Sequence, residues 1–121
     1  MINKNYFFED IANQLNYWID SSFSSMTNEN EDLIWTDNQS AFEKTQKIFS
    51  EDKLEGSEYQ LRQVLSECLR GYTISLLSVL DGTSELSNRG RVYLVDDSGA
   101  RLGEGLHDEF ITYLIDNGQL E

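Results

Sequence analysis

The chain contains no proline, one cysteine (Cys68), one histidine (His107) and only nine basic residues among its 121 residues. Because proline is the strongest helix breaker, its absence favours a mostly helical protein whose helices end at Gly, Asn, Asp or Ser. A single cysteine excludes an intrachain disulfide and a cysteine-rich zinc cluster. No apolar run approaches the roughly 20 residues that cross a bilayer, so no membrane-spanning segment is expected.

The N-terminal stretch MINKNYFFEDI has no apolar core of the kind found in signal peptides and soon reaches Glu9 and Asp10. The sequence therefore predicts no secretory signal. With so little cysteine, the expected location is the reducing cytoplasm.

Acidic residues dominate the charge, with 22 Asp and Glu against nine Lys and Arg and a formal net charge of -13. They are spread along the chain, so the whole surface repels phosphate backbones and anionic lipids. Nucleic acids and membranes are therefore not expected as direct partners, whereas a cationic protein would be attracted. A simpler explanation is that the acidity keeps a small protein soluble.

Apolar residues at three- and four-residue spacing predict four helices, over about residues 4–25, 38–50, 57–81 and 106–118. The helix over 57–81 carries the longest apolar stripe, and Cys68 is expected to be buried within it. We predict a mainly α, four-helix fold around this long central helix. At 121 residues the chain is expected to form a single globular domain over 1–121.

A short β-hairpin is predicted at about 91–102, before the last helix. RVYLV alternates β-branched and aromatic residues, DDSG is a turn signal, and ARL returns antiparallel. Three arginines, Arg89, Arg91 and Arg101, surround this hairpin. We expect them to pair with neighbouring acids such as Asp96 and Glu104.

Acids and the only histidine concentrate in LVDDSGARLGEGLHDEF, residues 94–110. An EF-hand loop counted from Asp96 requires Gly at its sixth position and Glu at its twelfth, where this chain has Arg101 and His107. Neither a metal nor another cofactor is therefore expected. Asp97 instead predicts a turn, and Asp108 and Glu109 favour the first turn of a helix. One alternative stays open, a small enzyme that uses His107 with Asp96 or Asp97.

The stretch TNENEDLIWTDNQS is predicted to be a polar loop around the apolar Leu33, Ile34 and Trp35. In size, acidity and exposed acidic loops such as TNENED, the chain resembles in general character the small acidic bacterial immunity proteins of polymorphic or contact-dependent-inhibition toxin systems. The resemblance implies a non-enzymatic protein that neutralises a cognate, basic toxin by covering its active or substrate-binding surface. A second alternative is a nucleic-acid-mimicking regulator or inhibitor of a DNA- or RNA-binding protein.

An exposed tryptophan ringed by acids is a reasonable binding hot spot, whereas the simpler interpretation places Trp35 in the core. The predicted partner-binding residues are Glu29, Glu31, Asp32, Trp35 and Asp37. The sequence is compatible with a monomer or a homodimer.

Overall fold

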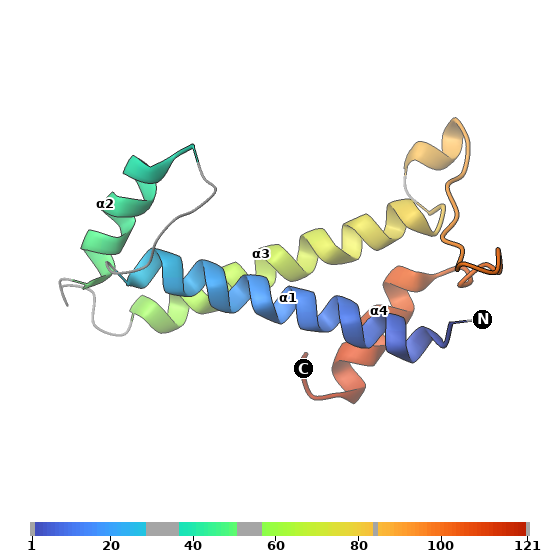
Figure 1. The fold of residues 1–121 in the computed structure, drawn as a ribbon, viewed down its shortest axis with the longest axis horizontal. Coiled ribbons are helices and arrows are strands. Elements are labelled where there is room, and N and C mark those ends of the chain that lie inside the picture. Colours follow the sequence, from blue (N-terminus) through green and yellow to red (C-terminus); the bar gives the residue numbers. More distant parts are fainter. Residues whose placement is uncertain (1, 29–36, 51–56, 84, 121) are drawn as a thin grey trace. The chain divides into compact units, whose positions relative to one another are not determined.

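Four α-helices and one short 3₁₀ helix follow one another along the chain. The computed structural model describes residues 2–28, 37–50, 57–83 and 85–120. The helices are α1 (Lys4–Thr27), α2 (Gln39–Ser50), α3 (Ser57–Leu80), the 3₁₀ helix η1 (Glu85–Asn88) and α4 (Leu106–Asp116) (Figure 1). The mainly helical class and the four predicted helices are confirmed, each end lying within two residues of its prediction.

The chain divides into two compact units, and the division falls within α1 and α3. Unit 1 comprises Met1–Leu15 and Arg70–Glu121, and unit 2 comprises Asn16–Leu69. The first half of α1, the second half of α3 and all of α4 therefore belong to unit 1. Unit 2 contains α2 with the remaining halves of α1 and α3.

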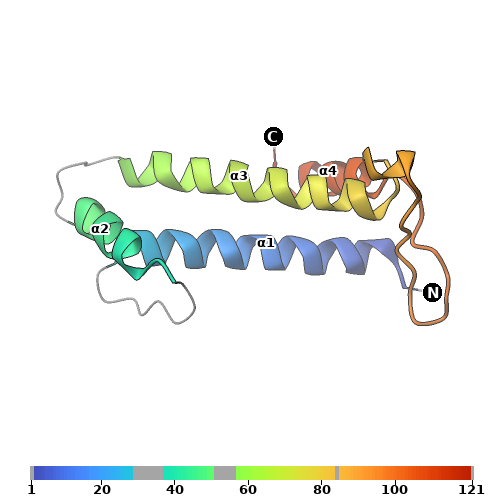
Figure 2. The same ribbon diagram turned by 90° about the horizontal axis from the view of Figure 1, so that it is seen from above.

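Unit 1 holds most of the buried apolar residues. In both views α4 lies beside the second half of α3 and the first half of α1 (Figures 1 and 2). Phe8 of α1 packs against Phe110 of α4 with ring centroids 5.8 Å apart. The buried apolar side chains of this unit are Phe8, Ala12, Leu15, Leu77, Leu102, Leu106, Phe110 and Leu114. This core fixes α4 against α1 and thereby positions the groove described below.

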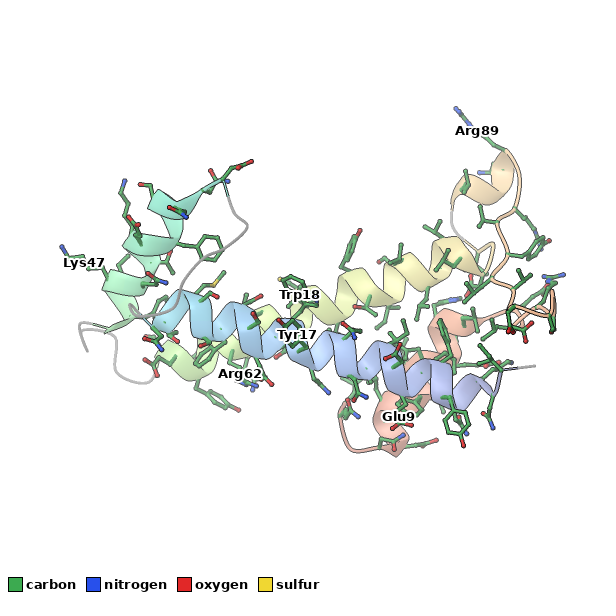
Figure 3. The ribbon with its side chains drawn as sticks, in the orientation of Figure 1. Glu9, Tyr17, Trp18, Lys47, Arg62 and Arg89 are labelled. Carbon is green, nitrogen blue, oxygen red and sulfur yellow. The ribbon has the colours of Figure 1, made fainter. Side chains whose placement is uncertain are left out.

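Unit 2 is held by a smaller set of contacts. Ile19 and Gln46 are buried, and the Gln46 side-chain amide donates a 2.7 Å hydrogen bond to the backbone carbonyl of Ser25. Arg62 forms an ion pair with Asp20. Tyr17 and Trp18, in contrast, project from the surface of α1 (Figure 3).

The prediction of α3 as a surrounded central helix is wrong. Leu77 is its only buried residue, whereas Val64, Tyr72 and Leu76 are exposed. Cys68 was predicted to be buried and is exposed, since it lies one turn from both Val64 and Tyr72 on the same uncovered side. Periodicity identified an apolar helix, but it does not show which side chains of that helix are covered by other elements.

The predicted β-hairpin at 91–102 is also wrong. Within the described ranges, the only β-pairing in this segment is an isolated antiparallel bridge between Val95 and Arg101. The turn itself forms as predicted, because the Asp96 N–H donates to the Ala100 carbonyl at 2.9 Å and Gly99 has a φ of +83°. Val92 and Val95 are exposed, so no packed face stabilises the strands, and an isolated two-stranded ribbon is marginal in water.

None of the helices in the described parts of the chain combines the length and the apolarity that crossing a membrane requires.

Candidate functional site

The end of α3 and the start of α4 meet at the carboxylate of Asp81. Gly82, with a φ of +76°, follows the last turn of α3 and lets the chain leave the helix. The Asp81 side chain is fully buried and accepts hydrogen bonds from the Thr83 hydroxyl at 2.6 Å and the Thr83 N–H at 3.2 Å. It also accepts from the His107 N–H at 3.1 Å, and His107 Nδ1 lies 2.5 Å from Oδ2. The carboxylate of Asp81 therefore joins the end of α3 to the start of α4.

Several donors stabilise the ionised form of Asp81. Burial by itself raises the pKa of this carboxyl, but the side-chain hydrogen bonds from Thr83 and His107, with the His107 N–H, outweigh it, so the pKa is lowered. Because an ionised carboxylate only accepts, Nδ1 of His107 carries the shared hydrogen. Nε2 of His107 lies 3.5 Å from Asp108 Oδ1. Through these contacts, His107 holds the start of α4 in place.

Asp96 forms a separate cluster in the preceding loop. Its Oδ1 accepts from the Ser98 hydroxyl at 2.6 Å and from the N–H groups of Ser98 and Ala100, at 2.9 and 3.0 Å. Its Oδ2 accepts from the Ile2 N–H at 2.9 Å. The Ser98 hydroxyl and the Ile2 N–H hold the pKa of Asp96 well below its ordinary value. Asp96 therefore ties the N-terminal segment to the turn.

The stretch 94–110 thus does not bring His107 to Asp96 or Asp97. The imidazole pairs with Asp81, Thr83 and Asp108, whereas Asp97 is exposed at the turn. The expectation that Asp108 and Glu109 lie in the first turn of the last helix is confirmed. Arg101 pairs with Glu104 at 3.2 Å, as expected, whereas Arg89 and Arg91 form no ion pair among the described residues.

The predicted partner-binding surface is described only at its edge. Glu29, Glu31, Asp32 and Trp35 lie outside the described residues. Asp37 is exposed two residues before α2. This surface therefore stays a prediction.

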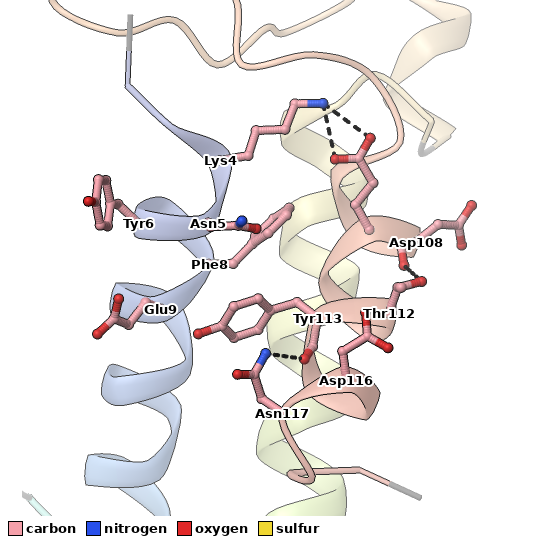
Figure 4. Close-up of a pocket in the computed structure, with 11 residues that line it drawn as sticks. Lys4, Asn5, Tyr6, Phe8, Glu9, Asp108, Thr112, Tyr113, Asp116 and Asn117 are labelled. Carbon is pink, nitrogen blue, oxygen red and sulfur yellow. Dashed lines mark hydrogen bonds and ion pairs between the residues drawn. The ribbon is translucent and has the colours of Figure 1, made fainter.

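A groove lies between the first turns of α1 and the outer side of α4 (Figure 4). Its volume is about 710 Å³. The lining residues used below are Lys4, Glu9, Asp108, Glu109, Tyr113 and Asp116. We call this feature the α1–α4 groove. All of its lining residues belong to unit 1.

Aromatic packing forms the rigid part of the α1–α4 groove. The Tyr113 ring is 5.9 Å from that of Phe8 and stacks on Phe110 at 6.4 Å with an interplanar angle of 8°. Helical spacing puts Tyr113 beside Glu109 and Asp116 on α4, and Lys4 beside Phe8 on α1. Since Phe8 and Phe110 are buried, the core itself positions the polar residues at the rim.

The charge of the α1–α4 groove is strongly negative. It contains four carboxylates and one ammonium, the Lys4 Nζ, which lies 3.1 Å from both oxygens of Glu109 (Figure 4). Among the described residues, Glu9 and Asp116 form no ion pair. A formal excess of three negative charges beside the half-buried Tyr113 ring suits a cationic partner.

Sequence reasoning missed this groove. Glu9 and Asp116 flank apolar stripes as solvated acids ordinarily do, and they are more than 100 positions apart in the chain. The described residues contain no group of three or more His, Cys, Asp or Glu side chains placed to hold a metal ion. No protein-family model, curated protein or solved structure matches this chain.

Proposed function

We propose that this protein is a non-enzymatic binding protein that neutralises a cognate basic bacterial toxin in the cytoplasm, by docking on it and covering its active surface. The observation that supports the proposal is the net negative charge of the α1–α4 groove, whose lining residues Glu9 and Asp116 form no ion pair among the described residues. The toxin as partner rests on the resemblance to immunity proteins.

Electrostatics supports a basic protein over other partners. The net charge of -13 produces a field that accelerates the encounter with a cationic surface and slows that with an anionic one. The groove adds a concave, partly aromatic surface at which the encounter can become a specific contact. A nuclease that grips phosphates must present basic residues, and an acidic protein that covers them would exclude its substrate.

The proposal is tested with the toxin domain encoded beside the gene for this protein. The affinity of the full chain is measured by calorimetry at 0.15 M salt and compared with that of a Glu9→Gln/Asp116→Asn variant. We expect the variant to bind about five- to thirtyfold more weakly, because each of the two exposed charge contacts contributes on the order of 0.5–1 kcal/mol. When each form is co-expressed with the toxin, the unmodified chain should rescue cell growth better than the Glu9→Gln/Asp116→Asn variant.

A matched control removes the same two charges elsewhere. Glu58 and Glu67 are exposed on α3 and lie in unit 2. Glu58→Gln/Glu67→Gln should leave the affinity within about twofold of that of the unmodified chain, as expected for charges outside the contact. Equal losses in the two double variants would show that only net charge matters, and an absence of toxin binding would overturn the proposal.

The two alternatives predict different results in the same assays. An enzyme that depends on His107 would lose protection on His107→Ala while it still binds the toxin domain. A mimic of nucleic acid would capture DNA- or RNA-binding proteins and would be displaced from them by DNA or RNA. Our proposal expects His107→Ala to reduce protection only as far as it reduces the amount of folded protein.

A further inference from the structure

The segment 91–95, RVYLV, has the composition of a β-strand but very little of the pairing. Among the described residues its one β-bridge joins Val95 to Arg101, and the two hydrogen bonds that flank this bridge are 2.9 and 3.0 Å long. Val92, Tyr93 and Val95 are exposed. The segment therefore presents strand-forming side chains to solvent without a sheet around them.

The unpaired backbone groups of this segment lie on one side of it. At the bridge, the Leu94 carbonyl and the Asp96 N–H point toward the stretch that contains Arg101. Because alternate residues of a strand direct their N–H and C=O groups to opposite sides, those of Val95 and of every second residue before it point away. No hydrogen bond between described residues occupies the backbone groups on that side. We call this side the outer edge, and its residues are Arg91, Tyr93 and Val95.

An open edge of this kind is a template for another strand. Pairing with the Arg101 stretch alone makes a two-stranded ribbon, which is marginal in water, whereas a third strand gives the number at which small sheets become stable. Strand addition supplies main-chain hydrogen bonds to groups that otherwise bind only water. The outer edge is therefore suited to pairing with a strand from outside the chain.

The charges at the two ends of the outer edge identify the strand that fits it. Arg89, which projects at the end of η1, and Asp97 are exposed and form no ion pair among the described residues (Figure 3). Tyr93 lies midway, four residues from each. When two copies pair antiparallel with Tyr93 opposite Tyr93, each Arg89 faces Asp97 of the other copy. In a chain of net charge -13, the stretch 89–97 has two Arg and two Asp and is thus complementary to itself.

The same register also matches the backbone groups. Tyr93 meets Tyr93 of the second copy, and Arg91 meets Val95 in both directions. Hydrogen-bonded pairs recur at every second residue of an antiparallel ladder, so all three pairs of the outer edge exchange N–H···O=C bonds. A register shifted by two residues would keep such bonds but would separate Arg89 from Asp97.

We propose that the outer edge pairs with the outer edge of a second copy of this chain, which forms an antiparallel homodimer centred on Tyr93. This inference goes beyond the proposed function and does not depend on a toxin. None of the residues that line the α1–α4 groove belongs to the stretch 89–97, so dimerisation and toxin binding can be tested separately.

The test measures the mass of the full chain by analytical ultracentrifugation. Small interfaces are weak, so we expect the mass to rise toward that of two chains between about 10 µM and 1 mM. Association should be stronger at about 0.3 M than at 0.05 M salt, because the rest of each copy is acidic and salt screens this repulsion. A protein that stays monomeric at about 1 mM in 0.3 M salt would overturn the proposal.

NMR on a mixture of isotope-labelled and unlabelled protein checks the register. Val92 lies opposite Leu94 of the second copy in a pair without hydrogen bonds, where the two backbones approach most closely. We expect an intermolecular contact between the Hα atoms of these two residues. Contacts between other residues in place of this one would contradict a dimer centred on Tyr93.

Two valine-to-proline variants form a matched pair. Val95→Pro removes an N–H of the outer edge from each copy, whereas Val92→Pro removes one on the opposite side, and both valines are exposed. We expect Val95→Pro to weaken the dimer about tenfold or more and Val92→Pro less than about threefold. Circular dichroism shows whether each variant keeps its helices. Equal losses in two folded variants would overturn the assignment of the outer edge.

Charge reversal tests the second copy as the partner. Arg89→Asp places acids opposite acids and Asp97→Arg places bases opposite bases, so each variant alone should dimerise at least about fivefold more weakly. An equimolar mixture of the two restores both ion pairs at the total charge of the unmodified chain, and should associate within about twofold of it. A mixture that associates no better than the separate variants would overturn the proposal. This comparison decides the question even if a proline variant fails to fold.

Discussion

Unit 1 contains two groups of acids with opposite surroundings. Asp81 and Asp96 are buried and are each surrounded by hydrogen-bond donors from the loops and the helix start. Glu9 and Asp116 lie at the rim of the α1–α4 groove and form no ion pair among the described residues. The comparison shows that a carboxylate stabilises the fold where backbone N–H groups donate hydrogen bonds to it. At the rim of the groove no such donors from the described residues surround the carboxylates, so these are available to a partner.

The largest effect is expected from Asp81→Ala. Four donors, two from Thr83 and two from His107, would lose their acceptor, so the free energy of unfolding should fall by about 2–3 kcal/mol. Urea unfolding followed by circular dichroism measures this. The groove variant Asp116→Ala should change stability by no more than about 0.5 kcal/mol, since it removes a negative charge from the last turn of a helix. Similar losses in the two variants would remove the distinction between the two groups.

The next effect concerns acid stability. The pKa values of Asp81 and Asp96 are lowered in the folded protein, so between the folded and unfolded pKa values the unfolded chain binds more protons. Their contribution is complete above the unfolded value of about 3.9 and is lost as the pH falls through the folded values. Urea unfolding at pH 2–6 should therefore show a shallower decline of stability for Asp96→Asn than for the unmodified chain. An identical pH dependence would contradict the role of Asp96.

The smallest effect on stability is expected from Lys4→Gln. The Lys4–Glu109 pair is partly exposed, so its loss should cost less than about 1 kcal/mol. The groove would gain one net negative charge, and the affinity for the basic toxin domain should rise about two- to threefold at 0.05 M salt. At 0.5 M salt this gain should vanish, because the charges are then screened over a few ångströms. Weaker binding at low salt would mean that Lys4 shapes the groove for its ligand.

The helices were predictable because each depends on local spacing. Phe8, Ala12, Leu15 and Ile19 recur at three- and four-residue intervals and are all buried in α1. Gly82 and Gly118 adopt positive φ angles just after α3 and α4, in agreement with the expectation that helices of this chain end at residues such as glycine. Asp108 and Glu109 fall in the first turn of α4, as their attraction to the helix dipole predicts.

The wrong predictions share one physical cause. Whether a residue is buried depends on which element of the fold packs against it. Alternation in RVYLV predicted strands, but no described element covers Val92 or Val95. Cys68 lies in an apolar stripe whose side of α3 is uncovered. The pairing of His107 could not be read from its neighbours Asp96 and Asp97, because its partner Asp81 is 26 positions away and is brought close by the approach of α3 and α4.

The sequence by itself determined the acidic surface, the helical class, the helix ends and the turn at 96–99, since charge, periodicity and glycine conformation act over a few residues. The tertiary structure alone decided which acids are satisfied and which are exposed. Packing of Phe8 on Phe110 brings α1 and α4 together so that Glu9 and Asp116 line one groove, and no local pattern encodes a contact between helices so far apart in the chain.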